Sequence, residues 1–137
     1  MNQITFTSNP NGKLSLDVFT DIRQANMLKF AIANEIEVVY KNKVLGTAVV
    51  EAYKCLRLNE INDVIAYANC GKQAFYQGTL IKKFYGSEVG PEYPLMIVVL
   101  RYVSRNWDAH ADMMMTSWNS RVERHNAPSK YLIKELP

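Results

Sequence analysis

Short apolar runs separated by turn-forming residues divide the first third of the chain into strands. Apolar and polar residues alternate over Ile4–Thr7, which predicts a short strand that ends at the turn cluster Asn9–Gly12. A second apolar segment covers Leu14–Arg23, and its β-branched and aromatic part, Val18–Arg23, predicts another strand. The pattern of this second segment does not fix which of its faces is buried.

A β-hairpin is predicted next. Glu35–Tyr40 and Val44–Cys55 are strand-like runs separated only by Lys41–Lys43, where Asn42 tolerates the positive φ of a tight turn. Gly46 inside the second run predicts a bulge or the close approach of another backbone. The length of this second strand suits a barrel strand that bends between two sheet surfaces.

Two helices follow, indicated by apolar residues at helical spacing. The first is expected to begin at the N-cap Asn59 and to end at Cys70–Gly71. Its apolar stripe consists of Ile61, Val64, Ile65 and Ala68. The second covers Lys72–Tyr85 and stops at Gly86. Its stripe consists of Tyr76, Leu80 and Phe84, with Ile81 and Tyr85 beside it.

The last third predicts a buried strand and a long amphipathic helix. The strand is Leu95–Val103, whose continuous apolar core is typical of a central strand. The helix is Asn106–Arg124. Its stripe consists of Trp107, Ala111, Met114, Trp118 and Val122. The tail Lys130–Leu136 either adds a short strand or packs irregularly. This order of elements indicates an α+β fold with one mixed or antiparallel sheet, made of a domain at 1–105 and an extension at 106–137 that docks on it.

Composition and charge narrow the class of protein. The chain has 137 residues, 48% hydrophobic and 21% charged, with a net charge of +3. This is ordinary globular usage, and the mild positive charge permits a polyanionic partner without requiring one. Met1–Pro10 lacks the features of a signal peptide, and the longest apolar run, Pro94–Leu100, is too short to span a membrane. We therefore expect a cytoplasmic protein without membrane partners, in which Cys55 and Cys70 are reduced structural thiols.

Several segments together resemble the ASCH branch of the PUA-like β-barrels. The similar segments are Phe19–Arg23 followed by Lys29, Asn34–Val38, Val44–Val50, Phe84–Gly86 and Leu95–Tyr102. The resemblance covers about Ile4 to Tyr102. It implies a PUA-like mixed β-barrel with helices packed at one end. It also implies a cleft beside Arg23 that takes RNA or modified nucleosides.

The chain departs from the family's signature of a glycine, a lysine two residues later and an arginine five residues after that. Arg23 matches the arginine, but Leu16 and Val18 replace the glycine and the lysine. Some similar bacterial proteins are amidohydrolases of acetylated cytidine, which use that lysine region, a threonine and a distal glutamate. Asp21 stands at the threonine position, and Lys72–Tyr85 contains no glutamate. We therefore expect this chemistry to be lost, and no other catalytic motif is visible.

Arg23 is the first candidate for ligand contact, because its guanidinium suits a phosphate or a base edge. The alternative is a structural ion pair with Asp21, Asp17 or a carboxylate across the sheet. Basic and aromatic residues also interleave along the chain, as in proteins that hold single-stranded nucleic acid. The alternative is that basic and aromatic residues are neighbours by chance and that most of the rings lie in the core. The candidate nucleic-acid-binding residues are Arg23, Thr20, Asp21, Lys29, Lys54, Arg57, Lys72, Tyr76 and Arg101.

The C-terminal helix carries an unusual Met113–Met115 run. Met114 lies on the predicted apolar stripe, and its neighbours are expected to be partly exposed. If the helix bound a protein partner, the contacts would come from Trp107, Met113, Met115 and Trp118. His110, Asp112 and His125 lack the spacing of a metal site, so no metal or cofactor is expected.

These observations leave three functions open. The leading one is a non-catalytic nucleic-acid-binding regulatory domain, above all for RNA. The alternative is a protein-interaction factor of the kind encoded by phages or mobile elements, acting through the C-terminal extension. The third is a nucleoside-processing amidohydrolase with an altered site around Thr20, Asp21 and Arg23.

Overall fold

The computed structural model describes residues 2–86 and 88–126, and the side chains among them up to residue 116. Contacts between Cα atoms divide the chain into two compact units, with the division after Arg105, and each unit is described by itself. The first unit contains β1 (Asn2–Phe6), the 3-10 helix η1 (Pro10–Ser15), β2 (Val18–Gln24), β3 (Glu35–Tyr40), β4 (Lys43–Arg57), the 3-10 helix η2 (Leu58–Glu60), α1 (Asp63–Cys70), α2 (Ala74–Tyr85) and β5 (Pro94–Arg105).

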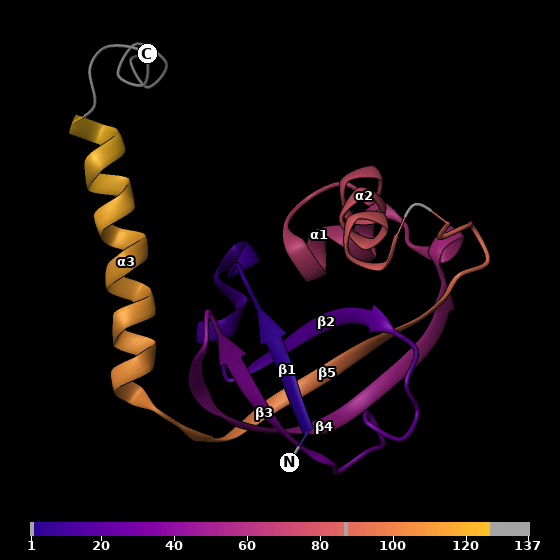
Figure 1. The fold of residues 1–137 in the computed structure, drawn as a ribbon, viewed down its shortest axis with the longest axis horizontal. Coiled ribbons are helices and arrows are strands. Elements are labelled where there is room, and N and C mark those ends of the chain that lie inside the picture. Colours follow the sequence, from indigo (N-terminus) through magenta and orange to yellow (C-terminus); the bar gives the residue numbers. More distant parts are fainter. Residues whose placement is uncertain (1, 87, 127–137) are drawn as a thin grey trace. The chain divides into compact units, whose positions relative to one another are not determined.

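The five strands form one mixed sheet in the order β1-β3-β4-β5-β2. β1 runs parallel to β3, and the other neighbouring pairs are antiparallel. The sheet curls into a half-barrel, and α1 and α2 lie together beyond one end of it (Figure 1). The predicted α+β class is therefore confirmed. β1 and β2 are the two edge strands, so the half-barrel is not closed by a backbone ladder between them.

The predicted hairpin is present. Lys41 and Asn42 form the two-residue turn between β3 and β4, with φ of 47° and 67°. Positive φ at both central residues gives a turn whose twist matches that of the strands. Gly46 lies beside a register shift between β3 and β4, and a Cβ at this position would overlap the carbonyl oxygen of Ser104 on β5. The close backbone approach expected at Gly46 is thus confirmed.

The core fills the inside of the half-barrel. β4 and β5 are the central pair and carry many of its side chains, as the apolar run of β5 predicted. The largest fully buried apolar side chains are Ile4, Leu14, Ile36, Leu45, Leu95, Met96, Leu100, Val38, Val50 and Val98.

The predicted start and face of the first helix are wrong. Its N-cap is Asn62, whose Oδ1 accepts a hydrogen bond from the Ile65 backbone N–H at 2.9 Å, and Asn59 lies in η2 instead. Ile61 therefore precedes the helix, and a stripe counted from it is out of phase. Val64, on the predicted stripe, is 78% exposed. The buried positions of α1 are Ala66, Asn69 and Cys70.

The face of the second helix is also rotated from the prediction. Tyr76 and Phe84 are exposed, and the buried residues are Gln77 and Ile81. A polar side chain can take this inner position because the Gln77 amide is hydrogen-bonded by Asn69 of α1. The expected stop is confirmed: Gly86 has a φ of 105° and its N–H donates to the Lys82 carbonyl.

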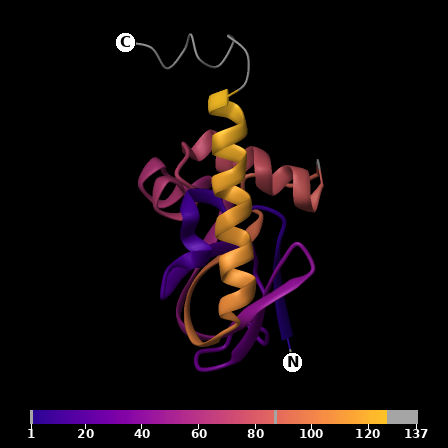
Figure 2. The same cartoon turned by 90° about the vertical axis from the view of Figure 1, so that its left-hand side faces the viewer.

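The second unit contains α3 (Trp107–Asn126), an uninterrupted helix close to the predicted range (Figure 2). Met114 was expected to be buried and is 58% exposed, whereas Met113 is buried. The predicted tail Lys130–Leu136 lies outside the described residues. Among the helices that the structure describes, none has the length and apolar character needed to cross a membrane.

Candidate functional site

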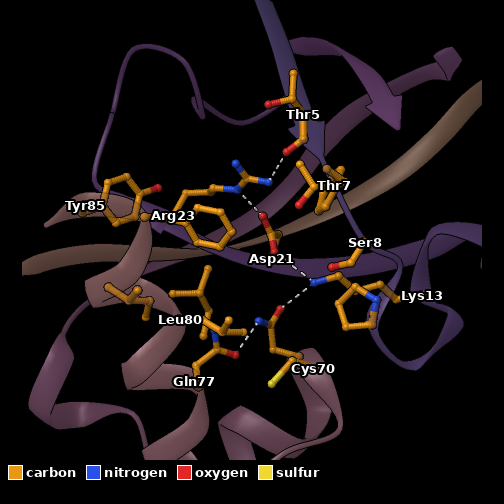
Figure 3. Close-up of a pocket in the computed structure, with 16 residues that line it drawn as sticks. Thr5, Thr7, Ser8, Lys13, Asp21, Arg23, Cys70, Gln77, Leu80 and Tyr85 are labelled. Carbon is orange, nitrogen blue, oxygen red and sulfur yellow. Dashed lines mark hydrogen bonds and ion pairs between the residues drawn. The ribbon is translucent and has the colours of Figure 1, made fainter. Parts of the chain in front are cut away.

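A pocket of about 300 Å³ lies within the first unit, where the edge strands β1 and β2 face α1 and α2. Its wall is built from β1 and the segment after it, η1, β2, α1 and α2 (Figure 3). These elements are far apart in the sequence, so the pocket is assembled by the fold and by no single motif.

Asp21 lies at the centre of the polar wall and binds two cations. The Lys13 ammonium is 2.9 Å from Asp21 Oδ1, and Arg23 Nε donates to Asp21 Oδ2. Lys13 and Asp21 are only 4% and 7% exposed. Two cations against one carboxylate leave this cluster with a net positive charge, and the burial of Lys13 and Asp21 makes electrostatic interactions between them stronger than in water.

Lys13 reaches the pocket because η1 folds back over the sheet. Asn11 and Gly12 both have φ near +60°, which turns the chain sharply just before Lys13. The following turn is fixed by hydrogen bonds from Tyr102 Oη to the Leu14 carbonyl at 2.9 Å and from Arg105 Nη1 to the Ser15 carbonyl at 3.0 Å. The lysine is thereby held at one place on the pocket wall.

Arg23 connects the two edge strands. Its Nη2 donates to the Thr5 backbone carbonyl on β1 at 2.7 Å, and its guanidinium lies over the Phe6 ring at 4.9 Å (Figure 3). Phe6 in turn makes an edge contact with Phe19 of β2. These side chains connect β1 and β2 across the seam, by which we mean the line between the two edge strands where no backbone ladder forms. With two of its five N–H groups in these hydrogen bonds, Arg23 has donors left for a ligand.

Asn69 and Gln77 continue the polar wall onto the helices. Asn69 Oδ1 accepts hydrogen bonds from Lys13 Nζ and from Thr20 Oγ1, each at 3.1 Å. Asn69 Nδ2 then donates to Gln77 Oε1 at 2.9 Å. The sequence analysis missed Lys13, Asn69 and Gln77. A polar residue on the buried face of a helix would have been the signal for Asn69 and Gln77. This signal is visible only when the buried face of each helix is predicted correctly.

Aromatic side chains form the outer rim of the pocket. Phe84 is 66% exposed although it lines the cavity, so much of its surface is accessible to a ligand. Tyr85 Oη accepts a hydrogen bond from the Gln24 backbone N–H at 3.1 Å, which leaves the phenol proton free to donate. Its ring stacks on that of Tyr93. The rim therefore combines a stacking surface with a hydrogen-bond donor.

Lys29 lies in the loop after β2. Partial burial, and secondly the charge of Arg23, lower the pKa of the Lys29 ammonium. The Lys29 ammonium therefore lies in the positive potential of the Arg23 guanidinium. An anion bound beside Arg23 would relieve it.

The predicted nucleic-acid-binding residues separate into two groups. Arg23 and Asp21 line the pocket, Thr20 joins its polar network, and Lys29 is coupled to Arg23. The others do not line it, and several have partners of their own. Arg57 pairs with Glu92, Arg101 with Glu51, and the Lys72 ammonium lies over the Tyr76 ring. Lys54 is exposed on β4. The structural ion pair considered for Arg23, with Asp21, is present.

The alternative candidates on α3 are only partly described. Trp107 and Met115 are exposed, Met113 is buried, and the side chain of Trp118 lies outside the description. Within the described residues, no group of three His, Cys, Asp or Glu side chains is arranged to hold a metal ion.

Lys13 supplies a basic group that the predicted site residues do not include. The segment around Arg23 supplies no lysine, and Val18, which occupies the family's lysine position, is exposed on β2. The structure instead brings a buried lysine to the same carboxylate from η1.

Comparison with known proteins gives a likeness of fold. No family model matches the chain, and a search of curated proteins finds no match either. Among solved structures, the crystal structure of protein EF3133 from Enterococcus faecalis V583, described with the family model DUF984, is similar with a TM-score of 0.61. The similarity covers 81% of each chain at 10% sequence identity. At this identity it shows a shared fold and nothing of the ligand.

Proposed function

We propose that this chain is a non-catalytic nucleic-acid-binding module that holds one nucleotide of a single-stranded RNA in the pocket at the seam. The observation that carries the proposal is the combination of a positively charged, donor-rich wall with an exposed aromatic rim in one cavity. A volume of about 300 Å³ is at the small end for ligand pockets, which suits one nucleotide and not a longer segment.

Charge supports an anionic ligand at the mouth of the pocket. Arg23 is more exposed than Lys13, with 28% of its side chain accessible against 5%. A phosphate at the mouth could therefore bind the remaining N–H groups of Arg23 without displacing Asp21. Lys29 lies near enough to Arg23 for the two charges to interact, although it does not line the pocket.

The rim supports a planar ligand. A base entering the pocket could stack on the exposed ring of Phe84, as bases stack on aromatic side chains in proteins that bind single strands. The resemblance to ASCH domains points to the same ligand class, and the curled mixed sheet is in keeping with a PUA-like barrel. The basic residues outside the pocket are partly neutralised by carboxylates, so we place the binding energy in the pocket.

Fluorescence anisotropy with a labelled single-stranded RNA of eight nucleotides tests this proposal. We expect binding at about 50 mM salt that weakens linearly with the logarithm of salt concentration, because phosphate contacts release counterions. Arg23→Met should weaken binding about tenfold or more. Arg101→Met is the matched control, since Arg101 also pairs with a carboxylate but lies outside the pocket lining. Undetectable binding, or equal losses in both variants, would refute the proposal.

A second function is favoured by the position of Lys13. A buried lysine and a carboxylate face one pocket 2.9 Å apart, which could supply a proton donor and a proton acceptor for hydrolysis of an amide on a modified nucleoside. This enzyme would turn over acetylated cytidine, and both Lys13→Met and Asp21→Asn would abolish the turnover. If the wild-type protein leaves acetylated cytidine unchanged, this second function is excluded.

A further inference from the structure

Among the described residues, Asn69 and Gln77 are the two neutral amides on the pocket wall, and Gln77 is fixed there by its hydrogen bond from Asn69. It projects from the inner face of α2 and is 6% exposed, yet it lines the cavity (Figure 3). Leu80 and Ile81 of the same helix line the pocket beside it. The surroundings of Gln77 are therefore less polar than those of Arg23.

The orientation of the Gln77 amide is dictated by Lys13. An ammonium can only donate, so the Asn69 atom that contacts Lys13 must be its oxygen. Asn69 then turns its amide nitrogen toward Gln77, and the Gln77 atom that accepts from it must be Oε1. It follows that Gln77 Nε2, with two N–H groups, is the end that does not face Asn69.

Those two N–H groups are open to the pocket. Gln77 Nε2 has no hydrogen bond to any residue that the structure describes, and among these residues no fully buried side-chain nitrogen or oxygen lacks a partner. Nε2 is therefore reached by solvent, and Gln77 lines this pocket. Both oxygens of Asp21 are occupied by cations, so this part of the wall offers donors to a ligand.

We propose that Gln77 determines the specificity of the pocket by requiring a carbonyl acceptor at the inner end of the ligand. This deepens the proposed function and rests on it, since the ligand is taken to be a base with its phosphate at Arg23. A carbonyl fits better than an anion here because Gln77 is neutral and its neighbours are apolar. A ligand that presents an N–H group to Gln77 would leave two donors facing each other, which sites built on hydrogen bonds reject strongly.

Two neutral planar probes separate these cases by NMR titration of the full chain. The probe 1-methyl-2-pyridone carries a carbonyl acceptor, and aniline carries chiefly a donor. We expect the wild-type protein to bind the pyridone about tenfold more tightly than aniline, which corresponds to one good hydrogen bond. The Gln77 side-chain amide signals should shift with the pyridone and show a nuclear Overhauser contact to it. This contact needs no variant, so it remains decisive if substitutions unfold the protein.

Variants test whether the orientation of Gln77 is the cause. In Asn69→Leu the Gln77 amide is free to turn over, so the preference for the pyridone should fall toward onefold. Gln77→Leu should remove the preference as well. The matched control Gln73→Leu, an exposed glutamine at the start of α2, should keep it. An unchanged preference in both pocket variants would overturn the proposal.

Inorganic phosphate serves as a third probe in the same titration. If phosphate shifts the Gln77 signals and the pyridone does not, the inner group of the ligand is an anion and the inference is wrong. The outcome is distinguishable from that of the proposed function. RNA binding without a probe preference would refute the role of Gln77 alone, whereas a probe preference without RNA binding would refute the RNA-binding function alone.

Discussion

Asp21 is a buried carboxylate that pairs with two cations on the pocket wall. Both of its oxygens are used by cations, one from η1 and one from its own strand. Taking Lys13 and Asp21 out of water is costly, and their attraction offsets this cost only while both are present. The same pairing holds two donors at fixed places on the pocket wall.

Removing that carboxylate should therefore destabilise the fold strongly. Asp21→Ala leaves the Lys13 ammonium buried without its counter-charge, and we expect the free energy of unfolding in urea to fall by roughly 3–5 kcal/mol. Glu92→Ala is the control, because the Arg57–Glu92 pair is exposed and such pairs contribute about 0–1 kcal/mol. A loss for Asp21→Ala no larger than that for Glu92→Ala would mean that Lys13 is solvated in solution.

At the scale of elements, η1 decides where the lysine lies, and Tyr102 of β5 holds η1 in place. Its hydroxyl donates to the Leu14 carbonyl, one residue after Lys13. Burial is the main cause that raises the pKa of Tyr102, and the charge of Arg105 opposes it only in part. The hydrogen bond needs the phenol proton, so the attachment of η1 depends on protonated Tyr102.

The stability of the fold should therefore decrease at high pH. Because the folded pKa lies above the unfolded value of about 10, the stabilisation by Tyr102 is complete below pH ~10 and is lost as the pH rises from there toward the folded pKa. The Tyr102→Phe variant should be about 1 kcal/mol less stable than wild type at pH 8. Its free energy of unfolding should fall less steeply than that of wild type between pH 8 and pH 11. Urea unfolding at the two values measures both. The control Tyr53→Phe, at an exposed position of β4, should keep the wild-type profile; parallel profiles for wild type and Tyr102→Phe would contradict this role.

The close approach of β4 and β5 depends on the absence of a side chain at Gly46. An added Cβ would overlap the backbone of Ser104 and Arg105 on β5, and neither backbone can move without breaking the ladder. We expect Gly46→Ala to lower the stability by roughly 1–3 kcal/mol or more, the range for overpacked sites. Gly90→Ala, with open space around the added methyl group, should stay within about 0.5 kcal/mol of wild type in the same thermal or urea unfolding measurement. Equal effects would show that the strands separate easily at this point.

Local patterns predicted strands better than helix faces. Alternation and the Lys41–Asn42 turn fix the strands because both signals act over a few residues. The phase of α1 depends on which asparagine caps it, and the sequence offers both Asn59 and Asn62. An error in the cap rotates the predicted face. Asn69 was therefore not recognised as an inner residue, although it connects Lys13 to Gln77.

At the scale of the whole molecule, the site depends on contacts that no local pattern contains. Lys13 and Asn69 are 56 positions apart, and the edge strands that Arg23 joins are not neighbours in the sheet. Arg23 could be predicted because it matches the arginine of the family signature, and Asp21 because it lies two residues before Arg23 on the same strand. The lysine and the two amides could not, since only the curling of the sheet and the packing of α1 on η1 and β2 bring them together.

In the proposed function, RNA enters the pocket at the seam of the half-barrel and stacks on its rim. Ultraviolet cross-linking of single-stranded RNA to the full chain, followed by trypsin digestion and mass spectrometry, tests it directly. We expect cross-links at Phe84 or Tyr85, within the tryptic peptide 84–101, and their loss in Arg23→Met. Cross-links confined to the basic stretch around Lys54 and Arg57, or to α3, would contradict the claim.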